Sequence, residues 1–530
     1  MIRDFQMPGR SAVYATGGLV AASHPLAASA ALDVLRHGGN AVDAAITAAA
    51  VLPVAEPQMT SLGGDCFAIV AEPDGTLHGL NGSGRSPAAL TPERVAEAGL
   101  DEMTAEHGYS VTVPGAVDAW SRLMDRFGTI GLDRALAPAI DLAERGVPVA
   151  PRVALDWAGE VDRLKADAGA RRHYLRKDGS VPSVGDVMAY PALAATMRAI
   201  AADGPSAFYG GAIAEDLVAA IASHGGCMTP DDLTAVEASW VDPLLSGYRD
   251  ISVGELPPSG QGIIALMMLA ILDRFPLSGL DPAGPERLHL EIEAARLAYA
   301  SRDRFLCDPA SAEFPAGMLL EPAHIDALAA RIDPQRRMAD PGNIDPRDAT
   351  DTVYLCVVDG NGMAVSFINS LFYSFGSAIA GTKSGVLLQN RGTGFVTTPG
   401  HPNRVGPRKR PMHTLIPGLL ARDGLPTAVF GVMGGQYQAC GHAHVVSNLV
   451  DFGMDPQAAI DAPRVFIEGP LTMLEHGIAE ATAAGLAERG HQVARRQMPI
   501  GGGQMIYIDR DRGVLIGGSD PRKDGCAIGY

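Results

Sequence analysis

Residues 352–369 have the pattern of a β-hairpin and follow a segment of very different character. Two β-rich runs flank the turn residues Asp359-Gly360-Asn361-Gly362, and such Gly-containing turn residues between apolar runs are a strong hairpin signal. Residues 336–351 before the hairpin are polar, contain proline and glycine, and have few large apolar side chains. We therefore expect a linker there, at which the chain can be cut.

The first part of the chain alternates helix and strand patterns. A helix is predicted from Pro25 to Gly38, with Ser23 as its cap. Asn40 is predicted to cap a second, Ala-rich helix that ends before Pro53. Residues 66–71 and 76–80 form a further predicted hairpin.

Helical periodicity dominates from about residue 115 to 345, and strand patterns with many glycines dominate from 352 to 530. The predicted helices in the middle of the chain are 116–127, 134–145, 191–203, 212–223, 262–273 and 285–303. A length of 530 residues fits two to four domains, or one large domain with insertions.

Composition excludes some classes of partner. The net charge of −18 repels phosphate backbones, so nucleic acid is not expected as a partner. The apolar run 41–57 is too short and too polar to cross a membrane and is predicted to be a buried helix. The N-terminal residues lack the pattern of a signal peptide, so we expect a cytoplasmic protein.

The cysteines and histidines have no spacing typical of metal ligands. No two of the six cysteines form a CxxC motif, and we expect reduced, buried thiols. His107, His413 and His442 are scattered along the chain. The sequence therefore predicts neither a metal site nor a cofactor.

Thr352 opens the hairpin directly after the linker, and this position has chemical consequences if the chain is cut before it. A threonine inside a chain lacks a nearby base for its hydroxyl. Cleavage of the preceding peptide bond would give the same residue a free α-amine with a pKa near ~8, within reach of its own Oγ. One residue would then supply both nucleophile and base.

The region around Thr352 resembles the start of the small subunit in the γ-glutamyltranspeptidase family. The shared pattern comprises Thr352, Val357-Val358-Asp359, Gly360-Asn361, Ala364-Val365-Ser366 and Phe375-Gly376-Ser377. The resemblance extends over nearly the whole chain. Its further landmarks are 38–44, 62–65, 113–117, 207–209, 231–233, 257–260, 408–411, 434–435, 461–464 and 519–522.

The resemblance implies an enzyme that cuts itself between Asp351 and Thr352. The products would be a large subunit, 1–351, and a small subunit, 352–530, intertwined in one α+β fold, a four-layer αββα sandwich of the N-terminal-nucleophile hydrolase type. A dimer of such heterodimers is one assembly that the resemblance allows. An uncleaved family member without enzymatic activity is the non-enzymatic alternative.

The resemblance also assigns roles within the site. Thr352 would attack an amide carbonyl, and Ser370 stands where the family has a hydroxyl that supports the nucleophile and its maturation. Gly434 and Gly435 match the family's oxyanion-hole pair. Glycine suits that role because backbone N–H groups can then approach a substrate closely.

The chain departs from the family where γ-glutamyl-specific members bind the amino-acid end of their substrate. Ser83 replaces the arginine for the α-carboxylate, and Gly394 replaces the aspartate for the α-amine. Phe372 replaces an asparagine. Two further departures are His413 and Thr414, which stand where the family has paired serines.

These departures favour a substrate with a carboxylate and no α-amine, because an unpaired buried ammonium is costly. Arg391 and Arg85 are the cations offered in place of the lost groups, and Asn390, His413 and Thr414 complete the predicted substrate-binding set. Oxamate, a carboxylate beside a primary amide, would fit such a site. The alternative is a γ-glutamyl hydrolase or transpeptidase that acts on glutathione-like substrates and binds their amino-acid end through Arg85 and other groups.

Overall fold

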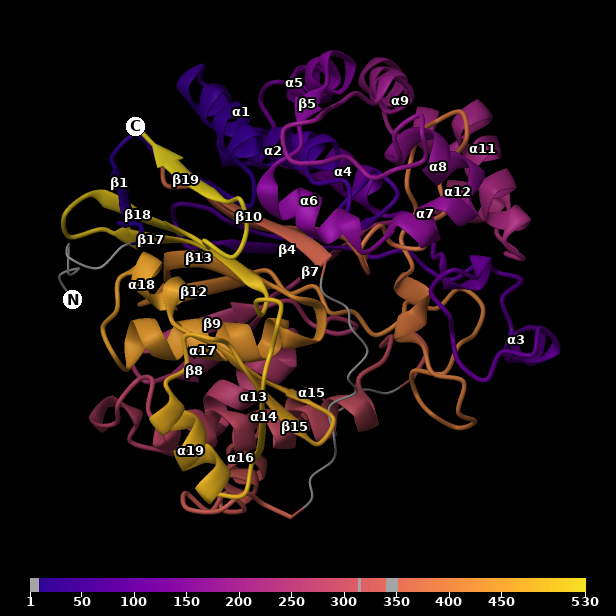
Figure 1. The fold of residues 1–530 in the computed structure, drawn as a ribbon. Coiled ribbons are helices and arrows are strands. Elements are labelled where there is room, and N and C mark those ends of the chain that lie inside the picture. Colours follow the sequence, from indigo (N-terminus) through magenta and orange to yellow (C-terminus); the bar gives the residue numbers. More distant parts are fainter. Residues whose placement is uncertain (1–8, 313–315, 340–350) are drawn as a thin grey trace.

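The computed structural model describes residues 9–312, 316–339 and 351–530. Two seven-stranded sheets are stacked between two groups of helices (Figure 1). One sheet has the order β1-β18-β17-β13-β12-β9-β8 and the other β19-β2-β10-β11-β3-β4-β7. All strand pairs within these two sheets are antiparallel. The expected four-layer αββα sandwich is confirmed.

The strands of the two main sheets come from both ends and the middle of the chain. The first sheet contains β1 (Val13–Ala15), β8 (Leu244–Tyr248), β9 (Ile251–Glu255), β12 (Gly418–Arg422), β13 (Leu425–Met433), β17 (Gly502–Asp509) and β18 (Val514–Ser519). The second contains β2 (Gly18–Ala22), β3 (Asp65–Ala71), β4 (Leu77–Gly82), β7 (Ser239–Val241), β10 (Asp351–Asp359), β11 (Ala364–Phe372) and β19 (Cys526–Gly529). Residues before and after the predicted cut site therefore share both sheets.

The second sheet is covered by helices from the first half of the chain, which are drawn in indigo to magenta in Figure 1. The helices of this part of the chain are α1 (Pro25–Arg36), α2 (Ala41–Ala55), α4 (Ala116–Phe127), α5 (Leu132–Arg145), α6 (Pro151–Ala158), α7 (Val161–Ala166), α8 (Ala168–Tyr174), α9 (Pro191–Asp203), α10 (Ser206–Tyr209), α11 (Gly211–Ser223) and α12 (Pro230–Thr234). A short ribbon of β5 (Val147–Pro148) and β6 (Val187–Met188) lies among them. Two more elements, α3 (Pro92–Glu97) and η1 (Gly108–Ser110), contribute to a small separate apolar cluster, and α3 lies to the side of the sheet in Figure 1.

The other helical layer covers the first sheet. It includes α13 (Gly262–Leu272), η2 (Leu277–Gly279), α14 (Pro285–Phe305), α15 (Ala316–Leu319), α16 (Pro322–Ala329), η4 (Gly435–Tyr437), α17 (Gln438–Val450), α18 (Pro456–Asp461) and α19 (Glu480–Glu488). The short η3 (Arg391–Gly394) instead contacts η1. A small sheet of β14 (Val465–Glu468), β15 (Leu471–Leu474) and β16 (Gln492–Arg495) lies beside α14. Three apolar clusters fill the spaces between the four layers.

Two local predictions near the N-terminus are corrected. The cap of α1 is His24, whose side chain accepts from the N–H of Leu26, while the hydroxyl of Ser23 bonds to the buried carboxyl of Glu56. The second helix runs through Pro53 to Ala55. Because every residue of α2 is buried, packing keeps its last turn helical although a proline there removes one backbone hydrogen bond.

The remaining local predictions agree with the structure. Asn40 caps α2 and forms a reciprocal capping box with Asp43. The hairpin after the linker is β10 and β11, and its turn is fixed by the Asp359 carboxylate, which accepts from the N–H groups of Asn361 and Met363. All six cysteines are free, but the expected burial holds for only four of them, since Cys227 and Cys526 are half-buried. Of the predicted linker 336–351, residues 340–350 lie outside the described residues.

Candidate active site

Thr352 is the second residue of β10, the strand beside β11 in the middle of its sheet. The pairing shifts at this point: Asp351 faces Phe372, whereas Val353 faces Asn369. Ser370 and Leu371 therefore form a bulge opposite Thr352. The bulge turns the Ser370 hydroxyl toward Thr352, with 3.1 Å between the two Oγ atoms. Thr352 is only 1% exposed.

Ser370 is a hydrogen-bond hub for this corner of the sheet. Its Oγ accepts from the N–H of Phe372 at 2.8 Å and from Nη2 of Arg391 at 3.3 Å. Phe372 has a φ of 86°, which is rare for a bulky side chain. The hydroxyl thus holds a strained backbone and links the candidate nucleophile to a buried cation.

Arg391 is fully buried at the start of η3. Its Nη1 donates to Oγ1 of Thr414 at 2.9 Å, and its Cζ lies 3.9 Å from the centre of the Phe372 ring. Nε has no hydrogen-bond acceptor among the described residues. Burial lowers the pKa of Arg391 to about 9, which still leaves the guanidinium charged at neutral pH.

Asp65 supplies the counter-charge. It opens β3, pairs with Ser370 in the register of β3 and β11, and its Oδ2 lies 3.9 Å from Nε of Arg391. Its Oδ1 accepts from the N–H of Gly84 and from Nε2 of Gln389. Burial raises the pKa of Asp65 to about 6, while the charge of Arg391 partly opposes this rise.

His413 completes this buried group as a neutral imidazole. The N–H of Leu415 donates to its Nδ1, so Nδ1 carries no proton. Nε2 therefore holds the proton and donates to Oδ2 of Asp65 at 2.9 Å. Burial and the charges of Arg391 and Arg410 keep the pKa of His413 well below its usual value. Arg391 and ionised Asp65 are thus the two charges of the group, and they balance each other.

Gly434 directly follows β13, and Gly435 is the first residue of η4. Their φ values of 120° and 52° fall in the region that favours glycine. The N–H of Tyr437 donates to the carbonyl of Gly434, which fixes the orientation of the peptide between the two glycines. Within the described part of the chain, neither glycine N–H has a hydrogen-bond acceptor. Such a pair of backbone donors suits an oxyanion hole.

The other residues of the predicted substrate-binding set differ in their surroundings. Asn390 is buried beside Arg391, its Oδ1 accepts from the N–H of Tyr373, and its Nδ2 has no partner among the described residues. Arg85, with 39% of its side chain exposed, instead binds Asp308 and the carbonyl of Arg408. No contact among the described residues joins Arg85 to Thr352, and its role in substrate binding stays a prediction.

Two charged residues of this region were not singled out from the sequence. Asp65 appears in the sequence analysis only within the landmark 62–65, although a buried acid at the first position of a buried strand is unusual. Arg410 is buried and bonds to the carbonyls of Ser83 and Glu237. Ser83 replaces the arginine that γ-glutamyl-specific members have at this position. The guanidinium of Arg410 contacts the backbone of Ser83 and so places a positive charge there.

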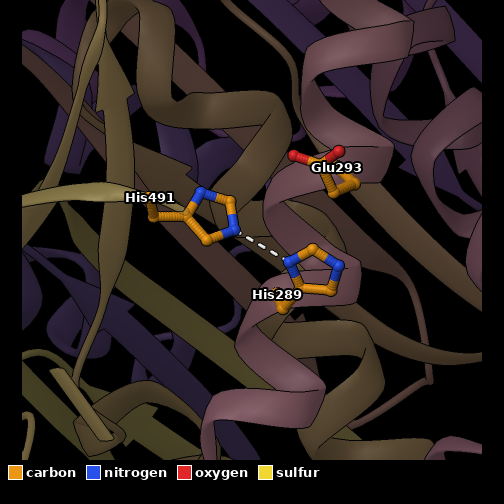
Figure 2. Close-up of side chains that lie close together, drawn as sticks. All are labelled: His289, Glu293 and His491. Carbon is orange, nitrogen blue, oxygen red and sulfur yellow. Dashed lines mark hydrogen bonds between the residues drawn. The ribbon is translucent and has the colours of Figure 1, made fainter. Parts of the chain in front are cut away.

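One set of potential metal ligands occurs among the described residues, away from Thr352: His289, Glu293 and His491 (Figure 2). Nε2 of His289 bonds to the carbonyl of Asp333, so its bare Nδ1 accepts from Nε2 of His491 at 2.8 Å. Both nitrogens of His289 and Nε2 of His491 are thus already used, and only Nδ1 of His491 has no hydrogen-bond partner among the described residues.

The carboxylate of this cluster is also engaged. Glu293 binds Nη1 of Arg296 at 3.0 Å and the N–H of Met338 at 2.8 Å. Burial, and after it the neighbouring His289 and the charges of Arg337, Arg296 and Arg489, lower the pKa of His491 to about 3. The three arginine charges also disfavour a divalent cation. We therefore interpret the cluster as structural: its hydrogen bonds attach residues 333–338 to α14.

The fold and the site together define a class. The αββα sandwich is the fold of N-terminal-nucleophile hydrolases, and Thr352 lies near the start of one of its central strands with the Ser370 hydroxyl beside it. The chain belongs to the γ-glutamyltranspeptidase family, whose model matches residues 27–530. This family has amidohydrolase and acylase members, and its enzymes act on carbon–nitrogen bonds.

Individual relatives cover the chain almost completely. It is 34% identical to the glutathione hydrolase-like YwrD proenzyme of Bacillus subtilis, over 98% of this chain and 99% of that protein. It is also 34% identical to the oxamate amidohydrolase proenzyme of Klebsiella pneumoniae, over 97% and 99%. The structure of cephalosporin acylase from Bacillus halodurans matches with a TM-score of 0.93 and 38% identity, over 100% of this chain and 99% of that one.

Among the described residues, no helix is long and apolar enough to span a membrane.

Proposed function

We propose that the chain is a self-processing threonine amidohydrolase that cuts itself between Asp351 and Thr352. Oγ of Thr352 attacks the carbonyl carbon of Asp351, and the acyl group moves from the Thr352 nitrogen to its oxygen. Water then hydrolyses the ester, which leaves a carboxylate on Asp351 and a free α-amine on Thr352. The large subunit is 1–351 and the small subunit is 352–530. The shared sheets support this proposal, since they would hold the two subunits together after the cut.

In the mature enzyme the α-amine of Thr352 takes the proton of its own Oγ as that oxygen attacks an amide carbonyl. The N–H groups of Gly434 and Gly435 stabilise the oxyanion. The tetrahedral intermediate collapses, the leaving amine accepts the proton, and an acyl ester remains on Thr352. Water attacks this ester by the same route and releases the acid.

We further propose that the substrate is a small amide with a carboxylate, such as oxamate. The observation that carries this proposal is a pair of buried donors on adjacent residues, Nε of Arg391 and Nδ2 of Asn390, neither of which has an acceptor among the described residues. A buried donor without an acceptor costs about 1–3 kcal/mol. A substrate carboxylate would supply the missing acceptors.

The surroundings give little support for binding of an α-ammonium. Gly394 has no side chain to offer, and the carboxylate of Asp65 already accepts from three donors and faces Arg391. The alternative of a γ-glutamyl hydrolase or transpeptidase draws its support from the relatives named glutathione hydrolases, which include one of Escherichia coli that is 30% identical.

The test compares three amides with the processed protein. Oxamate has the carboxylate, oxamide has the same carbon skeleton without it, and a γ-glutamyl anilide has the α-ammonium. We expect ammonia release from oxamate to exceed that from oxamide by about 10- to 100-fold, the value of one charge-assisted hydrogen bond. Anilide turnover above that of oxamate would reject the proposed substrate class in favour of the glutamyl alternative.

A denaturing gel addresses the non-enzymatic alternative. We expect two bands from the purified protein, and a single full-length band without amidase activity would reject the proposal of self-processing.

A further inference from the structure

Gln261 lies behind the candidate oxyanion loop and is completely buried at the start of α13. Its Nε2 donates to two backbone carbonyls, that of Gly435 at 3.0 Å and that of Thr414 at 3.1 Å. Its Oε1 accepts from Nη1 of Arg302 at 3.3 Å. Both amide hydrogens are therefore used, and the side chain has a single orientation that satisfies all its neighbours.

The two carbonyls belong to different parts of the site. The hydroxyl of Thr414 accepts a hydrogen bond from Nη1 of Arg391. Thr414 therefore lies on the side of the site where we place the substrate carboxylate. Gly435 belongs to the loop whose N–H groups we propose as the oxyanion donors. The side-chain amide of Gln261 thus links the residue beside the proposed carboxylate site, Thr414, to the proposed oxyanion loop at Gly435.

Arg302 on α14 holds this amide in place. Its Nε and Nη2 bind Asp303 at 2.8 and 2.7 Å, and its Nη1 also bonds to Oε1 of Gln436. The hydroxyl of Tyr299, one turn earlier on α14, bonds to the carbonyl of Gln436. The guanidinium lies over the Tyr299 ring, 4.5 Å from its centre. Helix α14 therefore binds Gln436, the residue after the glycine pair, through both its backbone carbonyl and its side chain.

The glycine pair depends on such support. Glycine populates many backbone conformations at low cost, so the φ values of Gly434 and Gly435 are not imposed by the residues themselves. An oxyanion hole is effective only when its donors are already oriented before the reaction. The contacts of Gln261 and Arg302 are among those that supply this orientation from outside the loop.

We propose that Gln261, held by Arg302, is a positioning residue that sets the distance between the carboxylate-binding side and the oxyanion loop. The inference rests on the proposed amidohydrolase function. Neither residue touches the reacting atoms, so both act on the rate through the placement of Gly434 and Gly435.

The test uses Gln261→Glu, which keeps the size of the side chain and replaces the donor by an acceptor that faces two carbonyls. We expect kcat for oxamate to fall by about 10- to 100-fold, as misplacement by about 1 Å does, while KM changes by less than about threefold. Arg302→Lys keeps the charge but cannot hold both Gln261 and Gln436, and a smaller fall in kcat is expected.

Gln457→Glu is the matched control. Gln457 is also buried, and its amide bridges Asp461 and both backbone groups of Ser519, away from Thr352. A fall in kcat that is equal in the Gln261 and Gln457 variants, or no fall in the Gln261 and Arg302 variants, overturns the inference.

Hydrogen–deuterium exchange gives a readout that needs no substrate. We expect the peptide that contains residues 434–437 to exchange at least about tenfold faster in Gln261→Glu than in Gln457→Glu, because the loop loses its support. Unchanged exchange would refute the positioning role. Failure of the wild-type protein to hydrolyse oxamate would instead reject the proposed substrate and leave the exchange result to decide the inference.

Discussion

Replacement of Ser370 by alanine tests how the bulge supports Thr352. The hydroxyl accepts from Phe372 and Arg391 and contacts Oγ of Thr352. A neutral hydrogen bond contributes about 1 kcal/mol and one to a charged group about 1.5–3 kcal/mol. Since both donors would stay buried without an acceptor, we expect a loss of about 2–4 kcal/mol in unfolding free energy.

This loss can be converted into a melting shift. With an unfolding entropy of about 2.1 cal/mol/K per residue, a chain of 530 residues has a slope of about 1.1 kcal/mol per kelvin. The expected fall in Tm is therefore about 2–4 °C. A small shift of this size leaves the protein folded, so its chemistry can be measured.

The larger effect is expected on self-cleavage and turnover. Loss of the contact to Thr352 and relaxation of the strained Phe372 should each weaken the placement of the nucleophile, and 1.4 kcal/mol corresponds to a tenfold change in rate. We expect Ser370→Ala to slow precursor cleavage and oxamate turnover by about 10- to 100-fold. A time course on denaturing gels measures the first rate, and ammonia release the second.

Ser377→Ala is the control, since Ser377 is also buried and bonds to the carbonyl of Leu388 and the N–H of Ile379. The control should melt earlier but cleave and turn over normally. Equal rates in wild type and Ser370→Ala would refute the supporting role of this hydroxyl.

Three further predictions concern the rest of the site. Arg391→Met should abolish the preference for oxamate over oxamide, measured as the ratio of kcat/KM values. Gly434→Ala should lower kcat by about 100-fold or more, because its φ of 120° strains any side chain and the new Cβ would lie 2.9 Å from Cα of Gly501. Asp65 has a folded pKa of about 6, above its unfolded value near 4, so its contribution to stability is complete below about pH 4 and is lost as pH rises to about 6. Urea unfolding between pH 4 and 7 should show this decline in wild type and a flatter profile in Asp65→Asn.

Local features of the fold were predictable because their causes are local. The turn at Asp359, the cap at Asn40 and the periodicity of α4 and α9 each depend on residues within one or two turns of chain. The cap at Ser23 was wrong because a distant residue, Glu56, takes its hydroxyl. The end of α2 was wrong because burial outweighs the helix-breaking tendency of Pro53.

The ion pair that balances the charge of the site could not be predicted from the sequence, because it also depends on a distant residue. Arg391 was expected to bind substrate, but its counter-ion Asp65 lies 326 positions earlier and meets it only through the register of β3 against β11. No local pattern reports which residues face each other across such a pair of strands. The same applies to Gln261, which reaches the oxyanion loop from α13.

The identity of the nucleophile is the central claim, and intact-mass measurement of wild type and Thr352→Ala tests it most directly. We predict two chains from the wild type, one ending at Asp351 and one beginning at Thr352, and a single inactive full-length chain from Thr352→Ala. A Thr352→Ala protein that is still cut at this bond, or an active wild type that remains one chain, would contradict the account.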